Sequence, residues 1–250
     1  MRRFVKPLIR NTLRKFGYDI WRYDPQAEGI DRLGVQLFRD LQLLLAATPH
    51  PLLLDVGANV GQTVRAYKDL FPQSTIHAFE PSPEAFETLR RATHTYTGVV
   101  LNNLGVGSAA GTAKFLEYKD SQWSSFLEPG EDNPGAVERE ISVDVTTLDC
   151  YCEEHNVEFV HLLKTDTQGF DFEVLQGART FLSSNRVQFV LTEVNFADHY
   201  KNSVSFDKLF RFLLEDGFKL VALYNFHYYG NYLSWCDALF KNPSFRESRS

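Results

Sequence analysis

Two segments in the first half of the chain carry residues suited to binding a cofactor. Asp55-Val-Gly-Ala-Asn-Val-Gly61 lies where an apolar run gives way to a helical pattern, and Glu80 follows the next apolar run. Glycine lets the backbone turn sharply and approach a ligand, and open α/β sheets bind cofactors at the carboxyl ends of their strands. A carboxylate at Glu80 can accept hydrogen bonds from both ribose hydroxyls of an adenosine cofactor.

The spacing of the glycines argues against a dinucleotide. A G-x-G-x-x-G loop frees helix amides for anionic phosphates, whereas this loop has Gly57 and Gly61 with Asp55 before them. A carboxylate at Asp55 suits the ammonium group of a methionine moiety better than a pyrophosphate. A purely structural strand-turn-helix corner is the alternative, and the acid at Glu80 makes it the less favoured one.

Candidates for removing a proton from an acceptor lie in the second half: Asp166, Glu193 and His199. The two acids are predicted at the carboxyl ends of the fourth and fifth strands, and His199 in the loop beyond. A positioned base typically contributes about 10²–10⁴ in rate. Asp166 is preferred for its place in the sheet. The alternatives are a structural acid paired with Lys164 and a solvated loop histidine. Two acids on adjacent strand ends are weak evidence for magnesium, so we expect no metal.

Alternating strands and helices are expected to position these residues. Apolar runs predict strands, and the segments between them have helical spacing, as in a mostly parallel sheet. The predicted strands are residues 52–56, 75–79, 99–102, 159–164, 187–194, 218–223 and 232–235, and the predicted helices 31–46, 60–70, 83–91, 148–155, 170–178 and 206–215. A Tyr-Gly-Asn turn makes the last two strands an antiparallel hairpin. Residues 113–145 contain a loop rich in Gly, Pro and acids, which predicts an insertion near the site.

The first sixteen residues contain basic residues and no acid: Arg2, Arg3, Lys6, Arg10, Arg14 and Lys15. A helix here would be basic and amphipathic. We expect it to pack on the rest of the protein with its charges in water, and the alternative is peripheral contact with an anionic membrane. With the next helix it would form an extension over residues 1–48, followed by the main domain at residues 49–250.

The composition is that of an ordinary globular protein. Of 250 residues, 44% are hydrophobic and 23% charged, and the formal net charge of −6 argues against nucleic acid as a partner. Three cysteines, Cys150, Cys152 and Cys236, fit neither a disulfide framework nor a zinc site. No segment resembles a secretory signal or a membrane span, so we expect a cytoplasmic protein.

Five segments together resemble the FkbM-type methyltransferases, over nearly the whole chain from about Gly17. They are Asp55 to Gly61, Phe79-Glu80-Pro81-Ser82-Pro83, Asn103-Leu104-Gly105-Val106-Gly107, Leu163 to Phe170 and Glu173 to Ala178. Many methyltransferases share the first two. The Lys-x-Asp-x-Gln-Gly block at Lys164 to Gly169, followed by Glu-Val-Leu-x-Gly-Ala, is far more specific to this family.

The resemblance implies a class I methyltransferase fold, that is, a Rossmann-like, doubly wound, mostly parallel seven-stranded sheet with a C-terminal antiparallel hairpin. It also implies S-adenosyl-L-methionine as cofactor and O-methylation of a small molecule, often a sugar or a polyketide-like metabolite. By position, Asp55 and Gly57 would hold the methionine part, Glu80 the ribose, and Asn103 with Leu104 the adenine edge. Asn59 and Gly61 of the first loop complete the expected cofactor site.

One position departs from the family pattern. Many relatives have Glu where this chain has Gln168, and an amide can hydrogen-bond but cannot act as a base. In the predicted insertion, Trp123 is the aromatic residue that we expect to contact a sugar-like acceptor. Two other functions remain open: an NAD-dependent oxidoreductase, which shares the βαβ unit, and a non-catalytic module that binds S-adenosylmethionine.

Overall fold

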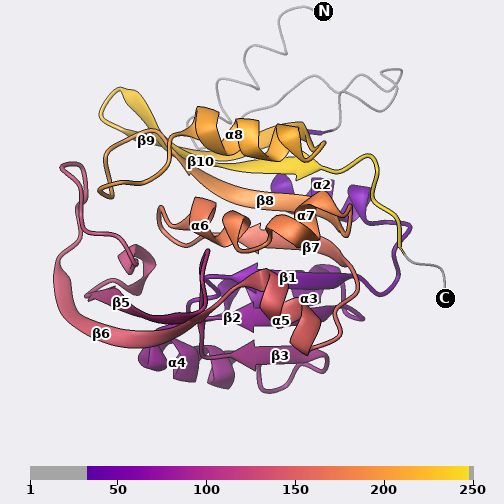
Figure 1. Ribbon diagram of the computed structural model, residues 1–250, viewed down its shortest axis with the longest axis horizontal. Helices are drawn as coiled ribbons and strands as arrows, with labels where there is room; N and C mark the ends of the chain where they lie inside the picture. The colour runs from indigo at the N-terminus through magenta and orange to yellow at the C-terminus, as the bar shows by residue number, and fades with distance from the viewer. Residues whose placement is uncertain (1–32, 248–250) are drawn as a thin grey trace, which may run out of the picture. The chain divides into compact units, whose positions relative to one another are not determined.

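A seven-stranded sheet organises the part of the chain that this computed structural model describes, residues 33–247 (Figure 1). The strand order is β3-β2-β1-β7-β8-β10-β9. The parallel strands are β1 (Leu52–Val56), β2 (Thr75–Phe79), β3 (Val99–Asn102), β7 (Val160–Thr165) and β8 (Val187–Asn195). β10 (Tyr232–Lys241) lies antiparallel between β8 and β9 (Lys219–Tyr229). The predicted fold class is confirmed.

The central strands are apolar because both of their faces are covered. Neighbouring residues point to opposite faces: Leu54 and Leu163 belong to one hydrophobic cluster, and Leu53 and Leu162 to the other. The first cluster includes residues of α5 (Leu148–Glu154), α6 (Asp171–Gln176), α7 (Arg179–Ser183) and α8 (Phe206–Glu215). The second includes residues of α2 (Leu37–Leu44), α3 (Gln62–Leu70) and α4 (Pro83–Thr93).

The chain has one more helix in this region than the sequence predicts. The helix predicted at residues 170–178 corresponds to α6, and α7 follows it after Gly177 and Ala178. The backbone at Gly177 passes directly against the Gly107 carbonyl, so a Cβ there would lie 2.0 Å from its oxygen. This close approach packs the junction of α6 and α7 against the residue that follows Val106.

A second, three-stranded sheet lies beyond the carboxyl ends of the parallel strands (Figure 1). It consists of β4 (Gly105–Val106), β6 (Val137–Thr146) and β5 (Gly111–Tyr118), in that order, and β5 and β6 pair antiparallel. The 3₁₀ helix η2 (Ser121–Trp123) follows β5. The residues for which the sequence predicts an insertion, 113–145, fall within this sheet and its loop.

The basic helix predicted in the first sixteen residues lies outside the described residues, and its contact with a membrane stays a prediction. Within residues 33–247, no helix combines the length and the apolar character needed to cross a bilayer.

Candidate active site

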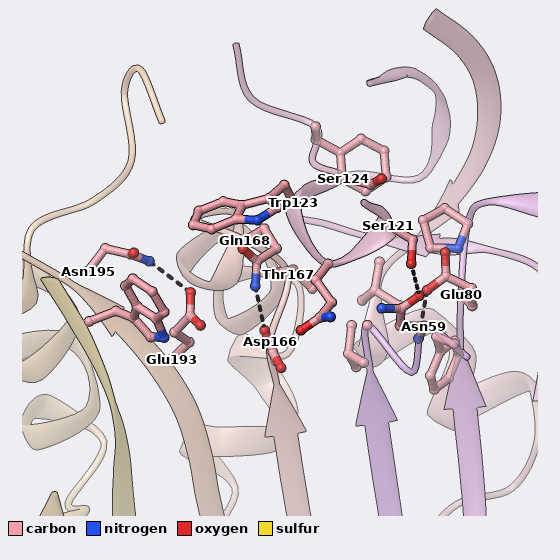
Figure 2. A pocket seen from close by; sticks show the side chains of 18 of the residues that line it. Asn59, Glu80, Ser121, Trp123, Ser124, Asp166, Thr167, Gln168, Glu193 and Asn195 are labelled. Carbon is pink, nitrogen blue, oxygen red and sulfur yellow. Dashed lines mark hydrogen bonds between the residues drawn. The ribbon is translucent and has the colours of Figure 1, made fainter. Parts of the chain in front are cut away.

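A pocket of about 560 Å³ opens at the carboxyl ends of β1, β2, β7 and β8, beneath η2 (Figure 2). Its lining divides into two sides, with Asp166 at the end of β7 between them. The β1–β2 side consists of Gly57, Asn59, Glu80, Leu104 and Gly105. The β8–β10 side consists of Glu193, Asn195, His199, Trp235 and Asp237, together with Asn225, Phe226 and His227 of β9.

The loop after β1 is shaped by its close approach to β7. Gly57 has φ 78°, and a Cβ there would lie 2.0 Å from the Asp166 carbonyl oxygen. Only glycine satisfies both conditions. Gly61 also has a positive φ, but it is the N-cap of α3, where a Cβ would lie 2.8 Å from Leu89 Cδ1. Gly57 therefore lines the pocket, whereas Gly61 permits α3 and α4 to pack closely.

Glu80 is held at the pocket by backbone amides. Its Oε2 accepts a hydrogen bond from Asn59 N and its Oε1 from Ser82 N, each at 2.9 Å. Burial raises the pKa of Glu80 to about 7, and these two hydrogen bonds oppose that rise. A carboxylate has about four lone-pair sites, so two remain for further donors such as ribose hydroxyls.

Asn103 supports this loop from behind. Its side-chain amide donates to the carbonyl oxygens of Glu80 at 2.8 Å and Pro81 at 3.2 Å. Leu104 is the neighbour that lines the pocket. The two residues that the resemblance assigns to the adenine edge thus differ in position: Leu104 lines the pocket, whereas the Asn103 side chain holds the backbone of the loop.

Asp55 is completely buried and faces Lys164. The Lys164 Nζ lies 2.8 Å from Asp55 Oδ1 and 3.6 Å from Asp166 Oδ2, and it donates to the Gly57 carbonyl oxygen at 3.0 Å. Burial favours the neutral amine, but the two carboxylates outweigh it and raise the pKa of Lys164 above its ordinary value. Asp55 therefore lies behind the wall that Gly57, Asn59, Glu80 and Leu104 form.

The structure brings the predicted acids together at the centre of the pocket. Asp166 Oδ1 accepts a hydrogen bond from Gln168 Nε2 at 2.9 Å, and Glu193 Oε1 accepts one from Asn195 Nδ2 at 3.1 Å (Figure 2). Burial raises the pKa of Glu193 well above its usual range, and the charges of Asp166, Asp171 and Asp237 add to this effect. The Gln168 amide cannot act as a base, and its hydrogen bond orients Asp166.

His199 is buried rather than solvated. Its Nδ1 lies 3.0 Å from the Asp132 carbonyl oxygen, and its Nε2 is hydrogen-bonded to the Ser234 hydroxyl. Because a carbonyl oxygen only accepts, Nδ1 carries a proton, and in the neutral ring Nε2 accepts from Ser234. Both ring nitrogens thus have partners, so His199 is less available as a base than the sequence suggests.

Aromatic rings surround this histidine. The His199 ring lies 5.5 Å from Trp123 and 5.3 Å from Trp235, in edge-to-face geometry. These rings form an aromatic wall that also includes His227, which is stacked on Trp235 with ring centroids 4.5 Å apart and planes at 6°. Trp123, which the sequence predicts to contact the acceptor, lines the pocket beside these residues.

η2 contacts both sides of the pocket. Its Ser121 hydroxyl donates to Asn59 Oδ1 at 2.9 Å on the β1–β2 side, while the Trp123 carbonyl accepts from the Tyr200 hydroxyl at 3.0 Å on the other side.

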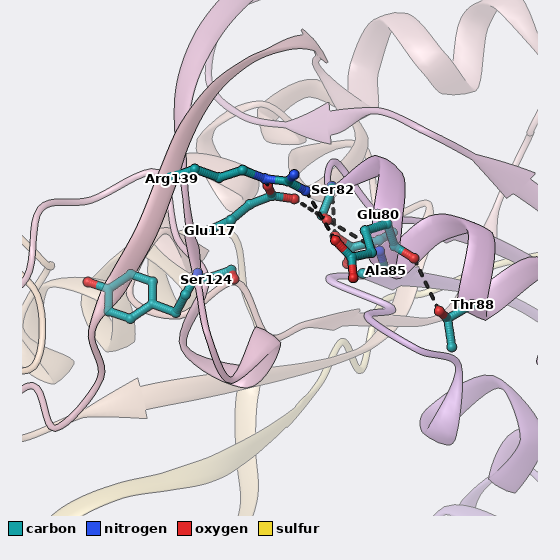
Figure 3. Close-up of polar contacts among 9 residues, drawn as sticks. Glu80, Ser82, Ala85, Thr88, Glu117, Ser124 and Arg139 are labelled. Atoms are coloured by element: carbon teal, nitrogen blue, oxygen red, sulfur yellow. Dashed lines mark hydrogen bonds and ion pairs between the residues drawn. The ribbon is translucent and has the colours of Figure 1, made fainter.

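The sheet that carries η2 is also tied to the Glu80 loop. Figure 3 shows the carboxylate of Glu117, on β5, between Arg139 and the hydroxyl of Ser82. The same Ser82 gives its backbone amide to Glu80 and its hydroxyl caps α4. Glu117 thus connects the small sheet to the carboxylate of Glu80 through one residue.

Sequence reasoning missed the residues that β9 and β10 contribute, above all Trp235 and Asp237. Asp237 pairs with Glu193 in the β10–β8 register, and its Oδ2 accepts from Asn225 Nδ2 at 2.6 Å. Burial raises the pKa of Asp237 to about 6. The available signal was the alternation Trp235, Asp237 on one strand, but which strand pairs with β8 is fixed only by the fold.

The fold and this site define a class. The chain has the class I methyltransferase fold, and the structure of the METTL16 methyltransferase domain shares it with a TM-score of 0.50 at 12% identity, covering 95% of this chain and 79% of that one. The family model described as Methyltransferase FkbM domain matches residues 55–220. The chain belongs to the FkbM methyltransferase family and is an enzyme of that family.

Curated relatives are similar at moderate identity. The 2-O-methyltransferase NoeI of Sinorhizobium fredii is 26% identical over 78% of this chain and 84% of its own length. The hexuronic acid methyltransferase AglP of Haloferax volcanii is 26% identical over 61% of this chain and 59% of its own. The chain spans less than two thirds of the length of several curated relatives that it matches.

Proposed function

We propose that this methyltransferase transfers a methyl group from S-adenosylmethionine to a hydroxyl group of a small molecule that carries a sugar-like ring. The observation that carries the proposal is a single pocket that joins the Gly57 and Glu80 side to an aromatic, carboxylate-bearing side at Asp166. The names of the relatives NoeI and AglP support O-methylation and a sugar acid acceptor in those proteins.

The β1–β2 side fits an adenosine cofactor. Glu80 keeps free lone pairs for ribose hydroxyls, and Leu104 offers an apolar surface for the adenine ring. Gly57 has no side chain, so the loop can approach Asp166 closely. When bound, S-adenosylmethionine supplies an electrophilic methyl group on a sulfonium. We place Asp55 and Gly61 in supporting roles, because their side chains or backbone shape the loop from behind.

The acids divide the remaining work. Asp166 accepts a hydrogen bond from Gln168 and lies near Lys164, so it is suited to orienting the acceptor. Glu193 is the better proton acceptor, since its Oε2 has no hydrogen-bond partner among the described residues and its pKa is raised. A general base works best when its pKa lies close to the operating pH. His199 holds the aromatic wall through its two hydrogen bonds.

The cofactor half of the proposal is tested by titration calorimetry of the full chain with S-adenosylhomocysteine and with NAD. We expect binding of S-adenosylhomocysteine only, weakened by Glu80→Ala by a few kcal/mol at most because charge-assisted hydrogen bonds are lost. Binding of NAD instead would favour the oxidoreductase.

The transfer half is tested with labelled cofactor against nucleotide sugars, glycolipid oligosaccharides and macrolide alcohols. Methyl transfer to a hydroxyl of any of these supports the proposal. Cofactor binding without transfer to any acceptor would instead favour a non-catalytic binding module.

A further inference from the structure

The charge of the pocket lining is uneven. Carboxylates from four strands reach it, those of Glu80, Asp166, Glu193 and Asp237, whereas no Lys or Arg lies among the lining residues in the described part of the chain. Lys164 is the nearest ammonium group on β7, and it is buried behind the wall in contact with Asp55 and the Gly57 carbonyl. A ligand anion in this pocket would therefore find no side-chain cation to pair with apart from a protonated histidine.

The anionic character is strongest on the β8–β10 side, where the acceptor would lie. Glu193 is 8% exposed, and its Oε2 has no hydrogen-bond partner within residues 33–247. Asp237 lies opposite Glu193 in the strand pairing, and both line the pocket. The donors next to them are the carboxamides of Asn195 and Asn225. These buried acceptors favour a ligand rich in donors, such as hydroxyl or ammonium groups.

The same side has a flat surface. Trp235 is stacked on His227, and Trp123 meets Trp235 edge to face with centroids 5.9 Å apart. Aromatic faces are negative and attract the weakly positive C–H groups of a ring or a nearby cation. The aromatic rings and the carboxylates thus favour the same kind of ligand, a polyhydroxylated ring without negative charge.

We propose that the β8–β10 side selects a neutral or amino-bearing sugar ring and rejects a ring that carries a carboxylate or phosphate. The inference rests on the proposed function and adds a charge rule to it. An anionic ring would be placed against Asp237, with Asp166 also in the lining, in a partly dehydrated pocket, where like charges repel more strongly than in water. Discrimination of this kind depends on what the site repels as much as on what it attracts.

The test measures binding of matched glycosides to the full chain saturated with S-adenosylhomocysteine, which adds no sulfonium charge. The probes are methyl glucoside, methyl glucosaminide and methyl glucuronide, titrated at neutral pH and followed by saturation-transfer NMR and by tryptophan fluorescence, to which the pocket residues Trp123 and Trp235 contribute. We expect the glucuronide to bind about tenfold or more weakly than the glucoside. The glucosaminide should bind at least as tightly as the glucoside.

Charge-neutral variants locate the effect. Asp237→Asn and the double variant with Glu193→Gln keep the size of the side chains and remove the charge of Asp237, so each should narrow the difference between the affinities for the glucoside and the glucuronide. Glu193→Gln alone replaces a carboxyl group that its raised pKa keeps protonated, so it should change that difference less. Glu128→Gln, on an exposed pair with Lys114 outside the pocket, should leave it unchanged. Retained affinity for S-adenosylhomocysteine in every variant shows that the fold is intact.

The charge rule is overturned if the wild-type chain binds the glucuronide as tightly as the glucoside or more tightly. It is also overturned if the double variant keeps the wild-type difference between the two affinities. Failure of all three glycosides to bind, in protein that does bind S-adenosylhomocysteine, overturns it too. Loss of S-adenosylhomocysteine binding is a different result, because it contradicts the proposed function itself.

Discussion

The Lys164 ammonium group and the Asp55 carboxylate form a buried ion pair, with Nζ 2.8 Å from Oδ1. This contact places the charge of the first cofactor motif behind the pocket wall, where it ties β1 to β7. The same Nζ donates to the carbonyl of Gly57, the loop residue where a Cβ would lie 2.0 Å from the Asp166 carbonyl oxygen. The pair therefore sets the position of the loop.

The first prediction concerns this ion pair. Lys164→Met leaves the Asp55 carboxylate buried without its partner, and removal of one partner of a buried pair typically costs about 3–5 kcal/mol. Adding Asp55→Asn removes the uncompensated charge, so the double variant should be more stable than Lys164→Met alone. Urea denaturation of the three proteins measures this. A double variant no more stable than the single one would contradict the ion pair as the cause.

The second prediction is a pH dependence of cofactor binding. Because burial raises the pKa of Glu80 to about 7, its carboxylate gains a proton as the pH falls through that value and loses part of its capacity to accept ribose hydroxyls. The affinity for S-adenosylhomocysteine should fall on acidification below about pH 7. Calorimetry across this range should show a flatter profile for Glu80→Gln, whereas Glu87→Gln on the exposed face of α4 should keep the wild-type profile.

The third prediction concerns Asp171 and stability. Burial raises the pKa of Asp171 to about 7, and the Asp166 charge adds to this. A raised carboxyl pKa means that the folded state binds an extra proton, so its stabilising contribution is present at acid pH and lost as the pH rises through about 7. Asp171→Asn removes this loss and keeps an acceptor for the Thr167 amide.

Asp171→Asn should therefore raise the free energy of unfolding above neutral pH by about 1–3 kcal/mol and change it little near pH 4, close to the ordinary carboxyl pKa of 3.8. Urea denaturation at both pH values measures the difference. A destabilised variant at alkaline pH would show that the ionised carboxylate is needed at this helix start.

The fourth prediction treats Glu117 as a positioning residue. Glu117→Gln weakens the hold on Ser82, whose amide stabilises the charged form of Glu80, so the affinity for S-adenosylhomocysteine should drop about two- to tenfold. The midpoint of the pH profile of binding should also move upward, since the hydrogen bond from the Ser82 backbone amide to Glu80 lowers the pKa of that carboxyl group. Glu128→Gln, in the loop between η2 and β6, is the control. A lower affinity with an unmoved midpoint would indicate a merely structural role.

The sequence predicts local features well and the meeting of distant strands poorly. Gly57 and Glu80 are recognisable because a turn and a strand end are set by a few neighbouring residues. Asp55 is correctly placed at the end of β1, but its burial against Lys164 depends on the pairing of β1 with β7. Asp237 and Trp235 reach the pocket through the antiparallel pairing of β10 with β8, which no local pattern specifies.

The last prediction separates proton transfer from positioning in the acid cluster. With an acceptor found in the transfer assay, Glu193→Gln should lower the single-turnover rate by about 10²–10⁴ and leave the affinity for S-adenosylhomocysteine nearly unchanged. The wild-type rate should rise with pH, because the raised pKa of Glu193 keeps its carboxyl group protonated until the pH approaches that value.

Asp166→Asn gives the decisive comparison. The charge of Asp166 is the largest electrostatic contribution that raises the pKa of Glu193 after burial itself. Its removal should shift the rising limb of the rate profile to lower pH, even if the maximal rate also falls because the acceptor is less well oriented. Asp237→Asn should cause a smaller shift in the same direction, since its charge contributes less. If Asp166→Asn abolishes the pH dependence while Glu193→Gln retains it, Asp166 is the base and Glu193 positions the acceptor.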